Sequence, residues 1–155
     1  QDNRYVLEII GYLSKYVIAR AVPNNSATTI AQFIVEEVIL KYGASRKILT
    51  HQDTHFKNEL MEKIALLMGF KHAFARTYHP QTNGQVERFN ATFYPQLAKL
   101  HDGNLNNWDE YLRACIFAYN TRLHNTTGYS PIQLMFAREP ILSFDSPTST
   151  ITLTV

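Results

Sequence analysis

Residues 78–90 read Tyr-His-Pro-Gln-Thr-Asn-Gly-Gln-Val-Glu-Arg-Phe-Asn, and this stretch determines how the rest of the chain is interpreted. Its first half contains a proline, an asparagine and a glycine, which predict a polar loop over residues 76–84. From about Gln85 apolar residues recur at helical spacing, so we predict a helix that Pro95 should kink or interrupt. Glu87 falls one turn into that helix.

The residues before this stretch predict alternating strands and helices. Residues 5–13 and 16–22 are rich in β-branched and aromatic side chains and are joined by a short connection, which predicts a β-hairpin. Ser26 can begin a helix that Gly43 ends, and residues 47–50 form a short apolar strand. A second helix over residues 56–68 and a strand over residues 70–75 complete this half.

The residues after the stretch predict helices. Asn107 should cap a fourth helix, and Ser130 with Pro131 should open a short last one. Residues 141–155 are rich in serine and threonine, which indicates a tail or linker after a single domain over residues 1–140. The element order predicts an α/β layer architecture with a mixed sheet.

Composition excludes several classes of protein. With 45% hydrophobic and 18% charged residues the chain has a globular balance. No apolar run approaches the roughly 20 residues that span a bilayer, so we expect no membrane partner. The single cysteine excludes an internal disulfide and a cysteine-rich zinc site. Because the chain begins at Gln1 without Met, we expect a piece of a longer polypeptide.

Charge is distributed unevenly along the chain. Residues 71–101 carry Lys71, Arg76, Arg88 and Lys99 against Glu87 alone. This local excess is compatible with phosphate contacts, but the charge alone favours an ordinary solvated face.

The stretch 78–90 resembles the signature loop and helix of integrases from Gypsy-type LTR retrotransposons and their retroviral relatives. Flanking segments are similar to the same family in the same order, over about residues 3–140: Leu13-Ser14-Lys15-Tyr16, residues 48–56, Asn107-Trp108-Asp109, residues 117–120 and residues 127–131. The resemblance implies an RNase H-like three-layer fold. It also implies a DNA partner, a possible homodimer, and a place in the nucleus or a virus-like particle.

The chemistry implied by the resemblance is DNA 3′-processing and strand transfer on two divalent ions, Mg²⁺ or Mn²⁺. Three carboxylates hold such ions, because magnesium prefers hard oxygen ligands. Glu87 matches the third acidic position of the family. His51 stands where the family has the second, an aspartate, and Asp53 replaces a family glycine. Glu87 and His51 are therefore the two candidate catalytic positions, and Glu87 is the metal candidate.

The first acidic position belongs to a strand that we expect to lie upstream of this sequence. Gly11 stands where many relatives carry an aspartate, but that residue lies on the family's second strand and is not the catalytic one. We therefore expect an RNase H-like fold that lacks its first strand.

The replaced acid leaves two interpretations open. His51, Asp53 and Glu87 could form a rearranged site for one metal ion, since a neutral imidazole binds transition metals. Alternatively, His51 has drifted at a position without chemical function. His51 offers no charge to Mg²⁺, so we expect metal not to be bound productively.

Six residues of the stretch are candidates for contact with DNA. Short polar and cationic side chains bind phosphates and base edges. The six are Tyr78, Gln81, Asn83, Gln85, Arg88 and Asn90.

The sequence thus predicts a retroelement integrase core that binds DNA and is catalytically inactive. The alternative is a domesticated, non-catalytic module for binding DNA or protein. Other aromatic residues, including Trp108 and Tyr119, sit at helical spacing and are predicted to pack in the core, as is the Cys115 thiol.

Overall fold

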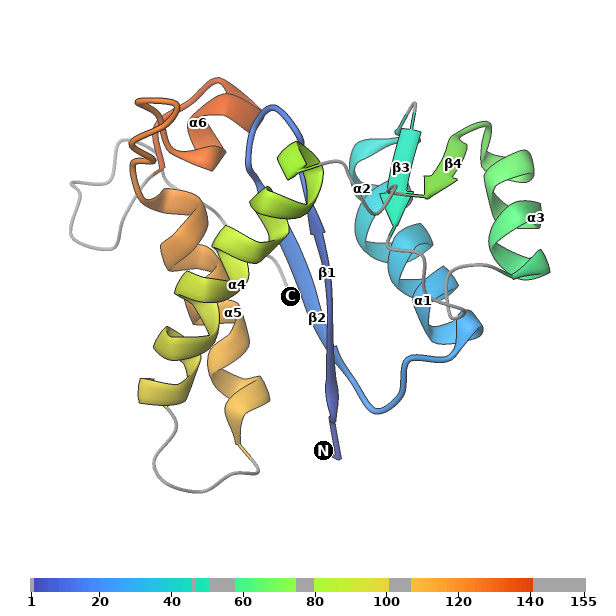
Figure 1. Ribbon diagram of the computed structural model, residues 1–155, viewed down its shortest axis with the longest axis horizontal. Coiled ribbons are helices and arrows are strands. Elements are labelled where there is room, and N and C mark those ends of the chain that lie inside the picture. The colour runs from blue at the N-terminus through green and yellow to red at the C-terminus, as the bar shows by residue number, and fades with distance from the viewer. Residues whose placement is uncertain (1, 46, 51–57, 75–79, 101–106, 141–155) are drawn as a thin grey trace, which may run out of the picture.

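The computed structural model describes residues 2–45, 47–50, 58–74, 80–100 and 107–140 (Figure 1). Within the helices and strands, the side chains of residues 74, 80–83, 85 and 100 lie outside this description. Strands β1 (Tyr5–Ile10) and β2 (Val17–Val22) form the predicted antiparallel hairpin, with register from Tyr5↔Val22 to Ile10↔Val17. The Gly11 N–H donates to the Tyr16 carbonyl at 2.8 Å, which closes the turn.

A helical segment follows the hairpin, as predicted. It consists of α1 (Ala27–Phe33), a π-helical stretch η1 (Ile34–Ile39) and α2 (Leu40–Tyr42). The Ser26 side chain accepts from the Thr29 N–H, which satisfies one of the free donors of the first turn. The segment ends at Gly43, whose φ of 84° lies in the region that favours glycine.

A parallel strand pair comes next. Strands β3 (Lys47–Thr50) and β4 (Lys71–Phe74) pair in parallel and are joined through helix α3 (Glu59–Met68). Helix α3 begins after Asn58, whose side chain accepts from the Met61 N–H at 3.0 Å. Residues 56 and 57 of the predicted helix lie outside the described part of the chain.

The expected mixed sheet is present as two small sheets. One contains β1 and β2, the other β3 and β4, and within the described residues no ladder joins them. A shared apolar cluster connects the two sheets instead. It includes Leu7 from β1, Ile48 from β3 and Met61 from α3, with residues of α1 and η1 between them.

Helix α4 (Pro80–Leu100) corrects two predictions. It begins at Pro80, within the segment predicted to be a loop, because proline needs no N–H partner at the first position of a helix and its φ angle is already helical. It also continues past Pro95 without interruption. Pro95 is exposed, so its ring projects into solvent rather than into the core.

Helices α5 (Trp108–Thr121) and α6 (Pro131–Phe136) complete the described fold. Asn107 precedes α5 as predicted, but its side chain makes no capping hydrogen bond, because its ψ of 12° departs from the extended backbone of a capping residue. Ser130 opens α6 with a capping box in which Gln133 is the reciprocal partner.

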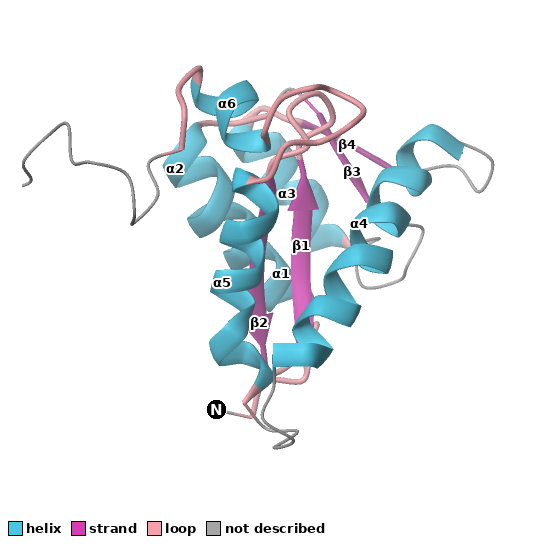
Figure 2. Cartoon of the chain, turned by 90° about the vertical axis from the view of Figure 1, so that its left-hand side faces the viewer, coloured by secondary structure: helices cyan, strands magenta, loops and turns pink. Residues whose placement is uncertain are grey.

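The hairpin lies between two layers, one on each of its faces (Figures 1 and 2). Leu7 and Val22 face α1 and η1, whereas Val17 faces the opposite layer of α4 and α5. The second layer buries a core of six residues: Val17, Phe89, Phe93, Leu97, Leu112 and Cys115. The Cys115 thiol is buried, as predicted, and Trp108 and Tyr119 pack against this core.

Asn120 fastens α5 to β2. Its side-chain oxygen accepts from the Val17 N–H at 2.9 Å, and its amide donates to the Val17 carbonyl at 2.8 Å. In the described part of the chain, no helix has the length and apolarity to cross a membrane. The predicted tail, residues 141–155, lies outside the described residues.

Candidate nucleic-acid interface

The first half of α4 carries most of the predicted site. The Glu87 and Arg88 side chains are exposed there, and Arg88 donates from Nε to the Gly84 carbonyl at 3.0 Å. This bond holds the guanidinium along the helix surface, one turn from its own backbone. Both side chains are therefore open to a ligand that approaches the start of α4.

Asn90 takes a different position from Arg88. It is half-buried, its Oδ1 is shielded from solvent, and its side chain forms a hydrogen bond with Glu8 of β1. Asn90 thus faces the hairpin as well as the surface that the sequence predicts for DNA.

Four other predicted residues have no described side chain. Gln81, Asn83 and Gln85 belong to α4 by their backbone. Tyr78, like the altered acidic position His51, lies outside the described residues. The DNA contacts predicted for Tyr78, Gln81, Asn83 and Gln85 therefore stay predictions.

The turn of the hairpin adds a cation that the sequence analysis missed. Burial lowers the pKa of Lys15, and the nearby positive charge of Arg88 lowers it further. Lys15 also donates to the Tyr12 carbonyl at 2.6 Å and lies over the Tyr12 ring. The only sequence signal was the Ser-Lys-Tyr connection, which says nothing about proximity to α4.

A third cation comes from the end of α5. His124 has a pKa lowered by burial, and the positive charges of Arg122 and Lys15 act in the same direction. Arg122 is exposed. We call Lys15, Arg88 and Arg122 the basic cluster, because the charge of Arg88 acts on Lys15, and the charges of Lys15 and Arg122 both act on His124. All three elements meet at one end of the molecule (Figure 1).

A buried carboxyl lies beneath α4. Because side chains alternate along a strand, Glu8 lies between Val6 and Ile10 on the face of β1 that packs against the α4–α5 layer. Burial raises the pKa of Glu8 to about 7, and the hydrogen bond with Asn90 opposes this shift only in part. Among the described atoms, Glu8 Oε2 and Asn90 Oδ1 are buried without a hydrogen-bond partner.

The described residues do not assemble the implied metal site. No group of three or more His, Cys, Asp or Glu side chains in the described ranges lies in metal-binding proximity. Glu87 is the described member of the expected acidic set, and Glu8 has a different environment. The candidates His51 and Asp53 lie outside the described residues.

The chain is similar in sequence to the integrase part of retroelement polyproteins. A family described as "Integrase core domain" matches residues 68–131. The retrovirus-related Pol polyprotein from transposon 412 of Drosophila melanogaster is 31% identical over 136 residues, which cover 88% of this chain and 11% of that protein. The Gag-Pol polyprotein of baboon endogenous virus is 29% identical over 90% of this chain and 8% of its own length. The chain therefore spans about a tenth of these relatives.

Two solved structures share the fold. The catalytic core domain of BIV integrase superposes with a TM-score of 0.70 at 19% identity, over 83% of each chain. A chain of the simian T-cell lymphotropic virus intasome, solved with a regulatory subunit of PP2A, superposes with a TM-score of 0.75 at 19% identity, over 95% of this chain and 54% of that one. The fold is that of retroviral integrase cores, which is RNase H-like.

Proposed function

Because the chain belongs to the family of retroelement integrase catalytic cores, we propose that it binds DNA at the end of the molecule where the basic cluster and the start of α4 meet, without cutting or joining it. The observation that carries this proposal is the convergence of Lys15, Arg88 and Arg122 from three separate elements.

Electrostatics favour a polyanion at this surface. Burial lowers the pKa of Lys15 and the positive charge of Arg88 lowers it further; a bound phosphate would offset the repulsion between the two cations. Arginine matches phosphate with two parallel donors, and Arg88 and Arg122 are both exposed. The Arg88 Nε donates to the Gly84 carbonyl, so its Nη groups are the donors that would meet a phosphate. Glu87, next to Arg88 on α4, is an exposed acid at the same surface.

The catalytic part of the proposal rests on the acidic set. The family chemistry uses Mg²⁺ or Mn²⁺ held by three carboxylates, and Glu87 supplies one in this chain. His51 supplies an imidazole where the second carboxylate is expected. One carboxylate cannot clamp two ions, so we propose that metal is not bound productively and that DNA strand transfer does not occur.

A salt titration of DNA binding tests the first half of the proposal. Arg88→Gln should weaken binding to duplex DNA and reduce the salt slope of the affinity by about one. Fluorescence anisotropy of a labelled duplex would measure both. The matched control is Lys63→Gln, because Lys63 is 64% exposed and pairs with Glu59 on α3, away from the cluster. Equal affinities and slopes for the two variants would contradict the proposed surface.

An activity assay tests the second half. Purified chain with Mg²⁺ or Mn²⁺ should give no strand transfer and no disintegration of a branched DNA substrate. If the unaltered chain shows turnover and the Glu87→Gln variant does not, the proposed inactivity is wrong. The two halves of the proposal can be contradicted separately, because the binding titration does not depend on any cleavage or joining of DNA.

A protein-interaction module is the second candidate, and α3 favours it. Leu66 and Leu67 are 84% and 81% exposed, an arrangement that costs free energy unless another surface covers it. A homodimer is the simplest partner. Sedimentation of the chain and of a Leu66→Lys, Leu67→Lys variant would decide: a monomer in both cases would exclude self-association through α3.

The cellular context follows the relatives, which are polyproteins of a transposon and of endogenous viruses. We propose a virus-like particle or the nucleus as the place of action. Fractionation of cells that express the parent polypeptide would test it, and recovery in neither fraction would count against it.

A further inference from the structure

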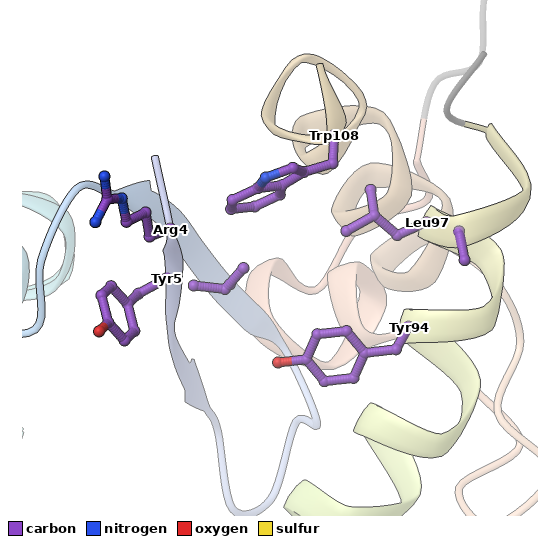
Figure 3. A pocket seen from close by; sticks show the side chains of 7 residues that line it. Arg4, Tyr5, Tyr94, Leu97 and Trp108 are labelled. Atoms are coloured by element: carbon purple, nitrogen blue, oxygen red, sulfur yellow. The ribbon is translucent and has the colours of Figure 1, made fainter. Parts of the chain in front are cut away.

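A pocket lies at the opposite end of α4 from the basic cluster. Its volume is about 530 Å³, and its walls come from the start of β1, the last turns of α4 and the first residue of α5. Figure 3 shows Arg4 and Tyr5 on the β1 side, Tyr94 and Leu97 on the α4 side, and Trp108 between them.

The walls offer aromatic surface to a ligand. Tyr5 is 44% exposed and Tyr94 is 48% exposed, so neither side chain is buried in the core. Trp108 is half-buried, with one part packed on the α4–α5 core and another lining the pocket. Figure 3 shows the Tyr94 and Trp108 rings on the same side of β1, where they can hold a flat ring by stacking or a cation by its charge.

Arg4 distinguishes between these two ligands. Its exposed guanidinium lines the same pocket and pairs with no acidic side chain in the described part of the chain, so it disfavours a cationic ligand. Asp109, which follows Trp108 in the sequence, accepts a hydrogen bond from the Asn3 amide at 2.6 Å. The site therefore favours a flat ring that is joined to an anion.

We propose that this pocket binds a nucleobase of a single-stranded nucleic acid, with the ring against Tyr94 and Trp108 and the adjoining phosphate at Arg4. Base–aromatic stacking combined with a cation is how sequence-tolerant sites hold single strands. The pocket shares no residue with the basic cluster, and α4 separates the two sites along its length (Figures 1 and 3). The proposal thus goes beyond the duplex-binding surface and does not depend on it.

The chain provides its own reporter, because Trp108 is the only tryptophan in the sequence. A thymidine tetranucleotide titrated into the intact chain should change Trp108 emission saturably, with free tryptophan in parallel to correct for absorption. The same strand without bases should cause no comparable change. An unchanged emission, or an equal change with the abasic strand, would overturn the proposal.

Two variants locate the contacts. Tyr94→Ala should weaken tetranucleotide binding by at least about fivefold, the lower end of the contribution of one stacked base. Arg4→Gln should lower the salt slope by about 0.7, the value for one phosphate of a single strand. Both side chains are on the surface, so circular dichroism of each variant should match that of the unaltered chain.

A matched control separates this site from exposed tyrosines in general. Tyr129 is 55% exposed and lies between α5 and α6, at the other end of α5 from Trp108. Tyr129→Ala should leave the Trp108 titration unchanged. If Tyr94→Ala behaves like Tyr129→Ala, or if a phosphate-free aromatic peptide binds as tightly as the tetranucleotide, the assignment is wrong.

Discussion

At the scale of single residues, Glu8 makes the stability of the fold depend on pH. Its pKa rises from 4.5 to about 7 on folding, so the native state keeps a proton that the unfolded chain releases. Stability should be full below pH 4.5 and fall as pH rises toward about 7, by about 3 kcal/mol at most. The titratable group Tyr94 faces Glu8, and its own pKa is raised by burial and then by the charge of Glu8.

The substitution Glu8→Gln should remove this dependence. Urea unfolding at pH 5 and pH 8 would show the unaltered chain losing stability between the two conditions while the variant changes little. Glu110→Gln is the control, because Glu110 is exposed on α5. A variant that is less stable than the unaltered chain at pH 8 would mean that the ionised carboxylate contributes favourably to the fold.

Residue identity also limits what the sequence could predict about the site. Arg88 and Glu87 are part of a recognisable motif, so their place on a helix surface was predictable. Lys15 and Arg122 join Arg88 only because the hairpin turn, α4 and the end of α5 meet in space, and no local pattern encodes that meeting. Glu8 was overlooked although it interrupts an apolar face, since its effect depends on which helix covers that face.

At the scale of elements, the edge of β1 opposite β2 has a testable consequence. The Gly11–Tyr16 bond continues the β1–β2 register, so hydrogen-bonded pairs recur at Ile9 and Leu7. The N–H groups of Val6 and Ile10 therefore point away from β2. We expect the amide protons of Leu7 and Ile9 to exchange with solvent more slowly than those of Val6 and Ile10.

Amide exchange followed by nuclear magnetic resonance would measure these rates. An added upstream strand that pairs with β1 should slow exchange at Val6 and Ile10 and raise the melting temperature. Equal protection at all four positions in the unaltered chain would show that this edge is already covered.

The ends of helices were predictable where a capping side chain or a glycine determines them, and not where the backbone angles or the tertiary position do. Ser26, Gly43 and Ser130 mark helix ends by capping or by a positive φ, and each was predicted. Asn107 has the right side chain, but its backbone angle prevents the bond. Pro80 was assigned to a loop because proline, asparagine and glycine together are typical of turns, although proline is also common at the first position of a helix.

At the scale of the whole molecule, the layers were predictable and the continuity of the sheet was not. The order of strands and helices along the chain and the apolar faces of the helices follow from apolar periodicity, which is why the α/β architecture could be predicted from the sequence. Pairing between β1 and β3 depends on contacts between distant segments. The one indication of a divided sheet was the expectation, from the family resemblance, that the first strand lies upstream of this sequence.

The division of the sheet affects how the molecule melts. The two sheets are joined through the apolar cluster that contains Leu7, Ile48 and Met61, and apolar packing is not directional. A shared ladder would instead couple both halves by hydrogen bonds. Heat should therefore release the β3–α3–β4 part before the hairpin with α4 and α5. In scanning calorimetry, the measured enthalpy should exceed the van't Hoff enthalpy, which is the mark of more than one cooperative unit. A ratio of one would mean that apolar packing alone makes the two halves melt together.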